Sequence, residues 1–164
     1  MNPTAKPLKA SIVSGYFSPL HPGHLELFEQ AQARSGYLIV IVNNDAQQIL
    51  KKGKIIQLDT DRLRIVRALR VVDAAYLAVE QGRGIDGSFD AIRADYPDTV
   101  LEFCNGGDRG DISTLPQEEI DSAKRNDITL RYGIGGFEKL DSSSRILAAL
   151  EEEESSGPAS GRRG

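Results

Sequence analysis

The chain has 164 residues, of which 40% are hydrophobic and 27% are charged, and its formal net charge is −4. This length suits one domain with a single core, and the acidic balance argues against a nucleic-acid-binding face. A single cysteine excludes an internal disulfide, and no apolar run is long enough to span a membrane. The N-terminus has no apolar signal segment, so we expect a cytoplasmic protein.

The first half of the chain predicts strands that alternate with helices. The runs 10–13 and 37–42 are short and rich in β-branched residues, as in buried strands, and the stretch 24–36 between them has apolar residues at helical spacing. A second helix is predicted near 58–70, where acidic residues can cap its start, and a third strand over 74–79.

The second half continues the same alternation. The predicted elements are helix 88–97, strand 99–104, helix 115–125, strand 128–134 and a final helix 142–154. Strands that alternate with helices imply a parallel sheet covered on both faces, and right-handed crossovers make it doubly wound. We therefore predict an α/β fold with a five-stranded, Rossmann-like sheet. Residues 1–154 are expected to form one domain, and residues 155–164, which are mostly small or polar, a disordered tail.

Polar and glycine-rich segments follow the predicted strands, where a doubly wound sheet binds its ligands. These segments are SGYFSPLHPGH (14–24), VNND (42–45) and CNGGDRGD (104–111), and YGIGGFEKLDSSSR (132–145) joins the last strand to the last helix. Glycines there allow the backbone to approach a ligand closely, and the N–H groups at helix starts favour anions.

His21 and His24 are the only histidines, and they flank Pro22 and Gly23 at a predicted helix start. The positive end of the helix disfavours imidazolium, so both rings are expected to be neutral and to offer an N–H to a phosphate oxygen. One alternative is a helix cap with a solvated histidine, which leaves the pairing of the two histidines unexplained. Another is a zinc site, which lacks the further ligands that it needs.

Four motifs follow one another along the chain. They are HxGH within GYFSPLHPGH (15–24), a basic segment and helix in KKGKIIQLDTDRLRIVRALRVVD (51–73), GGDR within NGGDRGDISTLPQEE (105–119), and the serine-rich LDSSSRIL (140–147). In kind and order they resemble the motifs of the cytidylyltransferase-like nucleotidyltransferases, in which the second is a basic loop followed by a helix. The resemblance implies an enzyme that transfers CMP or AMP from a nucleoside triphosphate to a small phosphorylated acceptor and releases pyrophosphate. It also implies Mg²⁺ bound through the triphosphate, and a homodimer or larger oligomer.

The resemblance also implies a role for each matching residue. His21, His24 and Lys51 match catalytic positions, where the histidines bind the triphosphate and stabilise the transition state. The predicted nucleotide-binding residues are Gly15, Tyr16, Phe17, Gly23, Gly106, Gly107, Asp108, Arg109, Ser142, Ser143, Ser144 and Arg145, and the predicted substrate-binding residues are Lys54 and Arg62. No side chain is expected to bind a metal ion directly. Because the acceptor oxyanion attacks the α-phosphorus, no protein nucleophile is required.

Several alternatives stay open at this point. Tyr16 and Ser18 stand where close relatives often have Thr and Asp, which leaves the acceptor and the base undecided. CTP is favoured over ATP, because the basic segment looks most like the cytidylyl branch. Lys52 and Lys54 could equally lie in a solvated loop, and serines 142–144 could simply cap the last helix. The alternative function is a nucleotide-binding regulatory module that has the fold without turnover.

Overall fold

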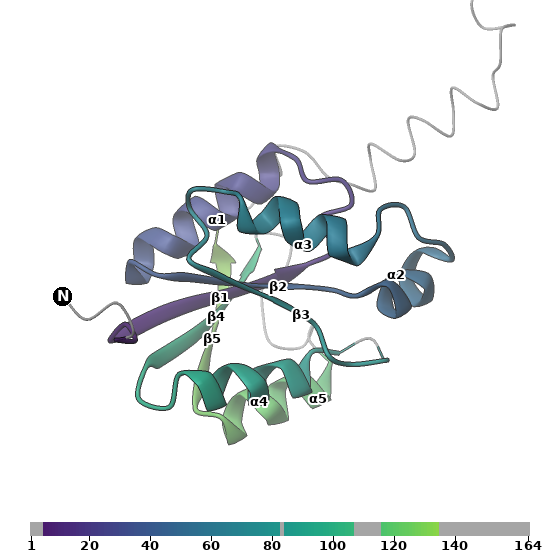
Figure 1. The fold of residues 1–164 in the computed structure, drawn as a ribbon. Coiled ribbons are helices and arrows are strands. Elements are labelled where there is room, and N and C mark those ends of the chain that lie inside the picture. The colour runs from purple at the N-terminus through teal and green to yellow at the C-terminus, as the bar shows by residue number, and fades with distance from the viewer. Residues whose placement is uncertain (1–4, 83, 107–115, 135–164) are drawn as a thin grey trace, which may run out of the picture.

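The computed structural model describes residues 5–82, 84–106 and 116–134, which form one sheet with helices on both faces (Figure 1). The strands are β1 (Lys9–Gly15), β2 (Leu38–Val42), β3 (Ala74–Leu77), β4 (Val100–Gly106) and β5 (Ile128–Ile134). The helices are α1 (Pro22–Ser35), α2 (Asp45–Lys52), α3 (Asp59–Arg67), α4 (Asp86–Asp95) and α5 (Gln117–Arg125). All neighbouring strands pair in parallel, so the predicted five-stranded, doubly wound, Rossmann-like α/β fold is confirmed.

The strand order β3-β2-β1-β4-β5 puts a topological switch point between β1 and β4. From β1 the chain moves to β2 and β3 on one side, and it then returns to β4 and β5 on the other. Sheets of this kind bind ligands at the switch point, outside the carboxyl ends of the strands. The HxGH segment follows β1 and the GGDR segment begins at the end of β4, so both start at this point.

Two apolar layers form the core, one on each face of the sheet. Consecutive residues of a strand point to opposite faces. Ile12 therefore packs in the layer that contains Phe89 of α4, whereas Val13 packs in the layer that contains Phe28 of α1. Figure 1 shows α1 and α3 over one face and α4 and α5 over the other. All five residues of β2 are buried, as expected for a strand that is covered on both faces.

Helix α2 is the main difference from the sequence prediction, which placed Lys51 and Lys52 in a loop. Both lysines lie in the last turn of α2, which ends at Gly53 in the left-handed conformation (φ 79°). The side chains of Asn44 and Gln47 form a capping box at the start of the helix. The helix lies beyond the carboxyl end of β2 (Figure 1), so a helical turn carries both lysines where a loop was expected.

Glu102 of β4 is a buried carboxylate that basic residues surround. Arg34 Nε lies 2.5 Å from its Oε2, and Arg131 Nε and Lys9 Nζ lie 3.4 and 3.8 Å from its Oε1. Burial alone would raise the pKa of Glu102, but the hydrogen bond and charge of Arg34 outweigh burial and hold the pKa at about 2. These ion pairs fasten α1 and the edge strand β5 to the middle of the sheet.

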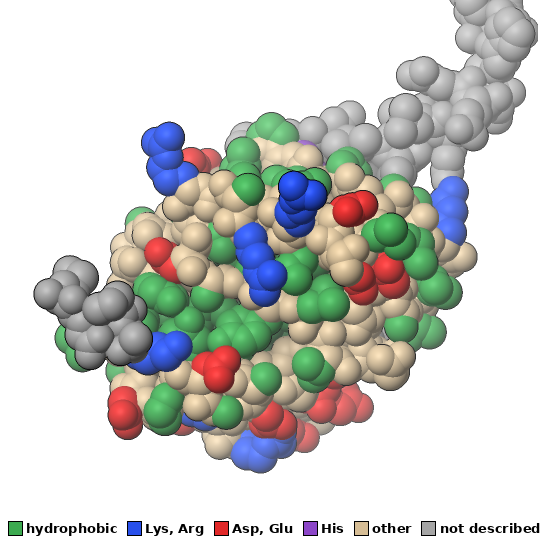
Figure 2. Space-filling view, viewed as in Figure 1, with side chains coloured by type: hydrophobic (Ala, Val, Ile, Leu, Met, Phe, Trp, Pro, Cys, Tyr) green, Lys and Arg blue, Asp and Glu red, His purple; other side chains and the backbone are tan. Residues whose placement is uncertain are grey.

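Three further predictions concern charge, membranes and the C-terminus. Figure 2 shows acidic and basic side chains interspersed on the face that it displays, without a basic patch there. Within the part of the chain that the structure describes, no helix has the length and apolarity needed to cross a bilayer. The predicted final helix 142–154 and the predicted tail 155–164 lie outside the described residues.

Candidate functional site

The two histidines cap the start of α1 reciprocally. His21 is the N-cap residue, and its Nδ1 accepts a hydrogen bond from the Gly23 N–H at 3.1 Å. The Nδ1 of His24 accepts in turn from the His21 N–H, also at 3.1 Å. An imidazole nitrogen that accepts a hydrogen bond carries no proton, so each neutral ring carries its proton on Nε2. The capping alternative and the donor role are therefore compatible, because they use different nitrogens.

Aromatic packing holds both rings in place. The His21 and His24 rings are stacked with their centroids 3.7 Å apart, and Phe17 meets His24 edge-on at 4.9 Å. Phe17 is 3% exposed and packs on Phe28 of the core. The HxGH turn is thus anchored to the apolar layer under α1.

Gly15 makes room for this arrangement. A Cβ atom at position 15 would lie 2.8 Å from the ring of Phe17, which is closer than a side chain can tolerate. The predicted nucleotide-binding residues Gly15 and Phe17 therefore lie beneath the histidines, where they support His24. Gly23 lies in the first turn of α1, and its N–H is used by the cap.

The last turn of α2 brings two cations to the HxGH segment. Lys51 Nζ and Lys52 Nζ lie 5.1 and 5.8 Å from the centroid of the Tyr16 ring. Lys52 Nζ also donates to the carbonyl oxygen of Ser18 at 3.2 Å. Burial, followed by the charges of Lys51 and Arg62, lowers the pKa of Lys52. Lys51 is exposed, so it can meet an incoming anion.

Arg62 does not occupy the position expected of a substrate-binding residue. Its side chain is fully buried, and its guanidinium donates to the carbonyl oxygens of Tyr16, Asn43 and Gln57 and to Oδ1 of Asp45, over 2.6–3.0 Å. The prediction of direct substrate contact is corrected accordingly. The sequence carries no sign that Arg62 is buried, because it lies in a helical pattern of mixed polarity. In the structure Arg62 links the segments that follow β1 and β2. Lys54, the other predicted substrate-binding residue, is exposed just after α2.

A buried amide network follows β2, and the sequence analysis missed its role. Asn44 Nδ2 donates to the carbonyl oxygens of Ala78 and Glu80, and Gln47 Nε2 donates to those of Gly82 and Gly84. These bonds fasten α2 to the segment that follows β3. The signal was present in NNDAQQ (43–48), because a run of amides and an acid directly after an apolar strand can satisfy neighbouring backbone groups.

The same network reaches the HxGH segment through Gln48. Its Oε1 accepts from Ser18 Oγ at 2.9 Å and from the Ile56 N–H at 3.0 Å. Ser18, which stands where an aspartate was expected, is completely buried and engaged in this bond. The segment that precedes His21 is therefore fixed to α2 by a side-chain bond as well as by the Lys52 contact.

The remaining predicted site residues are only partly placed. Gly106 is the last residue of β4 and pairs with Ile134 of β5, at the carboxyl edge of the sheet. The other predicted nucleotide-binding residues lie outside the described residues, namely Gly107, Asp108, Arg109, Ser142, Ser143, Ser144 and Arg145.

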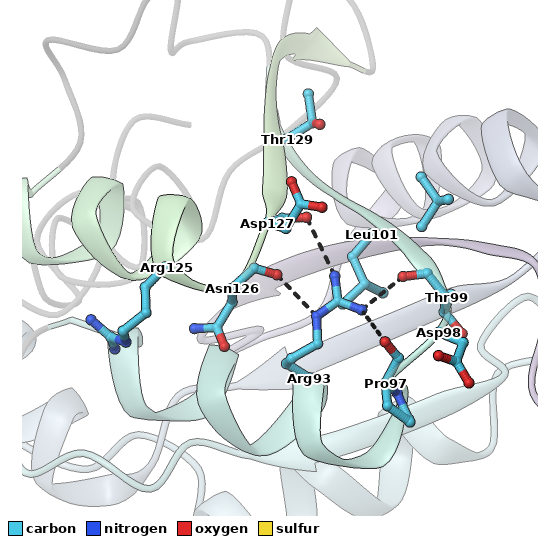
Figure 3. A pocket seen from close by; sticks show the side chains of 10 residues that line it. Arg93, Pro97, Asp98, Thr99, Leu101, Arg125, Asn126, Asp127 and Thr129 are labelled. Atoms are coloured by element: carbon cyan, nitrogen blue, oxygen red, sulfur yellow. Dashed lines mark hydrogen bonds between the residues drawn. The ribbon is translucent and has the colours of Figure 1, made fainter.

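A separate pocket of about 410 Å³ lies at the amino ends of β4 and β5 (Figure 3). Arg93 points into it, but the Arg93 guanidinium donates to the backbone oxygens of Asn126, Tyr96 and Thr99 at 2.8–2.9 Å. These bonds make Arg93 a structural residue of the pocket wall. The pocket is at the opposite edge of the sheet from the switch point, so we assign the candidate site to the histidines and α2 instead.

A comparison with protein-family models identifies the family of the chain. Residues 12–102, from β1 to β4, match the family model described as cytidylyltransferase-like. The chain belongs to the cytidylyltransferase-like family. The resemblance inferred from the motifs is therefore confirmed, and the chain is nucleotidyltransferase-like.

Named proteins related to this cytidylyltransferase-like chain come from different organisms. It is 32% identical over 131 residues to the bifunctional protein HldE of Caulobacter sp. (strain K31), which covers 79% of this chain and 23% of that protein. It is 36% identical over 74 residues to the FAD synthase of Ferroglobus placidus, which covers 45% of this chain and 48% of that protein. The matched region thus spans less than half of either relative's length.

A solved structure supports the fold of this family member. The chain resembles the crystal structure of the lipopolysaccharide core biosynthesis protein from Thermoplasma volcanium GSS1 with a TM-score of 0.56. The match has 23% identity and covers 81% of this chain and 98% of that one. The predicted preference for CTP over ATP is not supported by the relatives, since FAD synthase is named for a product that contains adenine.

Proposed function

We propose that this chain is a nucleotidyltransferase that transfers AMP from ATP to a small phosphorylated acceptor and releases pyrophosphate. The observation that carries the proposal is the hydrogen-bond pattern of the HxGH turn. His21 and His24 both accept backbone N–H groups on Nδ1, which makes Nε2 of each ring a hydrogen-bond donor at the switch point. Two donors at the positive end of α1 suit the oxygens of a triphosphate.

The chemistry needs position and charge rather than a protein nucleophile. An oxygen of the acceptor phosphate forms a bond to the α-phosphorus, and the bond from that phosphorus to the bridging oxygen breaks. Pyrophosphate leaves with the electron pair. The Nε2–H groups would stabilise the oxygens on which negative charge grows, and such donors are worth about 10²–10³-fold in rate.

The lysines of α2 supply the compensating positive charge. Two phosphorylated substrates bring several negative charges into a protein whose own net charge is −4. Lys51 Nζ and Lys52 Nζ lie 5.1 and 5.8 Å from the centroid of the Tyr16 ring, and Tyr16 directly follows β1. We propose that Lys51, which is exposed, bridges the donor and acceptor phosphates.

The choice of ATP rests on the relatives rather than on the motifs. The matched region of the FAD synthase relative includes no more than half of that protein, so its named product supports the base and not the acceptor. CTP is the second candidate, from the likeness of the basic segment to cytidylyltransferases. The acceptor is proposed only as a small phosphorylated metabolite.

Mg²⁺ is proposed to bind through the phosphate oxygens of the triphosphate. Among the described residues, no three His, Cys, Asp or Glu side chains form a metal-binding group. An ion held mostly by phosphate and water is the usual arrangement for Mg²⁺ at nucleotides, and the bound ion would offset the charge of the triphosphate.

The test is a panel of four nucleoside triphosphates, each with Mg²⁺ and a mixture of small phosphorylated acceptors, assayed for pyrophosphate release. We expect release with ATP, and less or none with CTP, GTP and UTP. Absence of pyrophosphate with every triphosphate and acceptor would overturn the proposal. Binding of ATP without turnover, unaffected by His21→Ala and His24→Ala, would instead support the regulatory module.

A homodimer or larger oligomer and a cytoplasmic location are proposed alongside this activity. Both come from the resemblance and the composition. Light scattering at the assay concentration tests the first, and a strict monomer would contradict it.

A further inference from the structure

Tyr16 lies between the HxGH segment and the cations of α2. Its ring centroid is 5.1 Å from Lys51 Nζ and 5.8 Å from Lys52 Nζ, both within cation–π range. We propose that Tyr16 is a positioning residue that holds these two ammonium groups at the HxGH turn for phosphate binding. The proposal rests on the proposed function, since it names how the cations of that same site are arranged.

Hydrogen bonds tie Tyr16 to its surroundings through its backbone and through its hydroxyl group. The Tyr16 hydroxyl donates to the carbonyl oxygen of Gln47 in α2 at 3.3 Å. The backbone oxygen of Tyr16 accepts from the buried guanidinium of Arg62 at 2.9 Å. Arg62 also holds Asn43 and Asp45, at the start of the segment that becomes α2. Tyr16 and the start of α2 are therefore joined by a direct hydrogen bond and through the shared partner Arg62.

The Tyr16 ring also offsets the repulsion between two neighbouring cations of α2. Lys51 and Lys52 are consecutive cations, and burial, followed by the charge of Lys51, lowers the pKa of Lys52. The face of an aromatic ring carries partial negative charge and attracts ammonium groups without neutralising them. The Ser18 carbonyl adds a second dipole for Lys52 at 3.2 Å. These contacts restrict both side chains before an anion binds, which favours binding because less side-chain freedom remains to be lost.

A positioning role and a purely packing role for Tyr16 predict that different variants lose anion affinity. Tyr16→Phe keeps the ring face and loses the hydroxyl group with its bond to Gln47, whereas Tyr16→Leu keeps apolar bulk and loses the ring face. If Tyr16 only packs, Tyr16→Leu retains anion affinity. If it positions cations, Tyr16→Phe retains affinity and Tyr16→Leu does not.

The experiment measures binding of inorganic tripolyphosphate with Mg²⁺ by calorimetry in the intact chain. Tripolyphosphate offers phosphates without base, acceptor or turnover. We expect Tyr16→Leu to raise the Kd about 5–20-fold, with Tyr16→Phe within about twofold of wild type. Lys51→Met should raise the Kd similarly, and Tyr16→Leu should add less than about twofold in the Lys51→Met background, because the ring acts through the lysine. Lys124→Met on α5 is the matched loss of an exposed lysine and should leave the Kd unchanged.

Wild-type affinity in Tyr16→Leu would overturn the proposal, as would full additivity with Lys51→Met or a wild-type protein that does not bind tripolyphosphate. If Tyr16→Leu does not fold, the Lys51 ε-methylene proton shift in the wild type decides. An upfield ring-current shift supports the proposal, and a shift at the random-coil position overturns it. Failure of the proposed function gives a different result. In that case tripolyphosphate binding still depends on Tyr16, but the protein releases no pyrophosphate from any triphosphate.

Discussion

The His21 and His24 rings lie stacked with 3.7 Å between their centroids and 26° between their planes. Each ring also satisfies one backbone N–H in the first turn of α1 through Nδ1. Helix capping and the proposed contact with phosphate therefore use the same side chains but opposite nitrogens. This division makes the two roles separable by substitution.

Replacement of His21 by asparagine separates the cap from the proton donor. Asparagine is a good N-cap residue, so His21→Asn should keep the free energy of unfolding within about 0.5 kcal/mol of wild type. It removes the Nε2–H, so kcat should fall about 10²–10³-fold. His21→Ala is the matched variant, in which kcat falls similarly and about 1 kcal/mol of stability is also lost. Urea unfolding and the pyrophosphate assay measure the two effects, and wild-type turnover in His21→Asn would contradict the donor role.

Gly15→Ala should disturb His24 through Phe17. The new methyl group would lie 2.8 Å from the Phe17 ring, which must move away and lose its contact with His24. We expect a loss of about 1–3 kcal/mol of stability and a lower kcat. Gly82→Ala is the control, because nothing lies within 4 Å of a Cβ atom at position 82. Equal behaviour of the two variants would show that Phe17 does not support the histidine.

Arg62→Met should destabilise the protein severely. The substitution removes donors from three carbonyl oxygens and from Asp45, and it leaves these acceptors without their partner. Loss of one partner from a buried charged network costs about 3–5 kcal/mol. Arg64→Met, on an exposed position of the same helix, should change stability by less than about 0.5 kcal/mol. Denaturant unfolding of both variants checks this, and a small effect of Arg62→Met would mean that Arg62 is not a structural cross-link.

The stabilising contribution of Glu102 should be lost in acid. Its pKa of about 2 in the folded chain lies below the ordinary value of 4.5, because the interaction with Arg34 outweighs burial. A depressed pKa contributes stability that is fully present above pH 4.5 and is lost as the pH falls toward 2. The loss should be on the order of 2–3 kcal/mol. Unfolding free energies measured across this range should decline in wild type and in Glu29→Gln, and decline less in Glu102→Gln. An equal decline in all three would assign the acid sensitivity to other groups.

The sheet and most helices were predictable because their hydrophobic periods are unambiguous. β2 is an unbroken apolar run, and Phe28 and Ala31 of α1 are buried at helical spacing. Helix α2 escaped prediction because it is only eight residues long and mixes amides with lysines, so capping and tertiary bonds decide its conformation. Its Asn44 cap and Gly53 terminator were visible in the sequence and would have found it.

The candidate site was predictable only where a motif carries local geometry. The histidines at the start of α1 follow from one short segment, and the structure places them as expected. Arg62 was misassigned, because its buried position depends on carbonyl oxygens of Tyr16 and Asn43, which are distant in sequence and which no local pattern reveals. The cation–π contacts of Tyr16 depend likewise on the orientation of α2 against β1.

The reciprocal cap constrains how positions 21 and 24 can change during evolution. Loss of the His24 side chain leaves the backbone N–H of His21 without this acceptor, and loss of the His21 side chain does the same to the N–H of Gly23. A single replacement at either position by a residue without a capping side chain thus weakens the helix as well as the chemistry, and a second replacement that restores the cap does not restore the chemistry. Homologous sequences that abandon this chemistry are therefore expected to exchange both histidines together, for residue pairs such as Ser and Glu that form a conventional capping box.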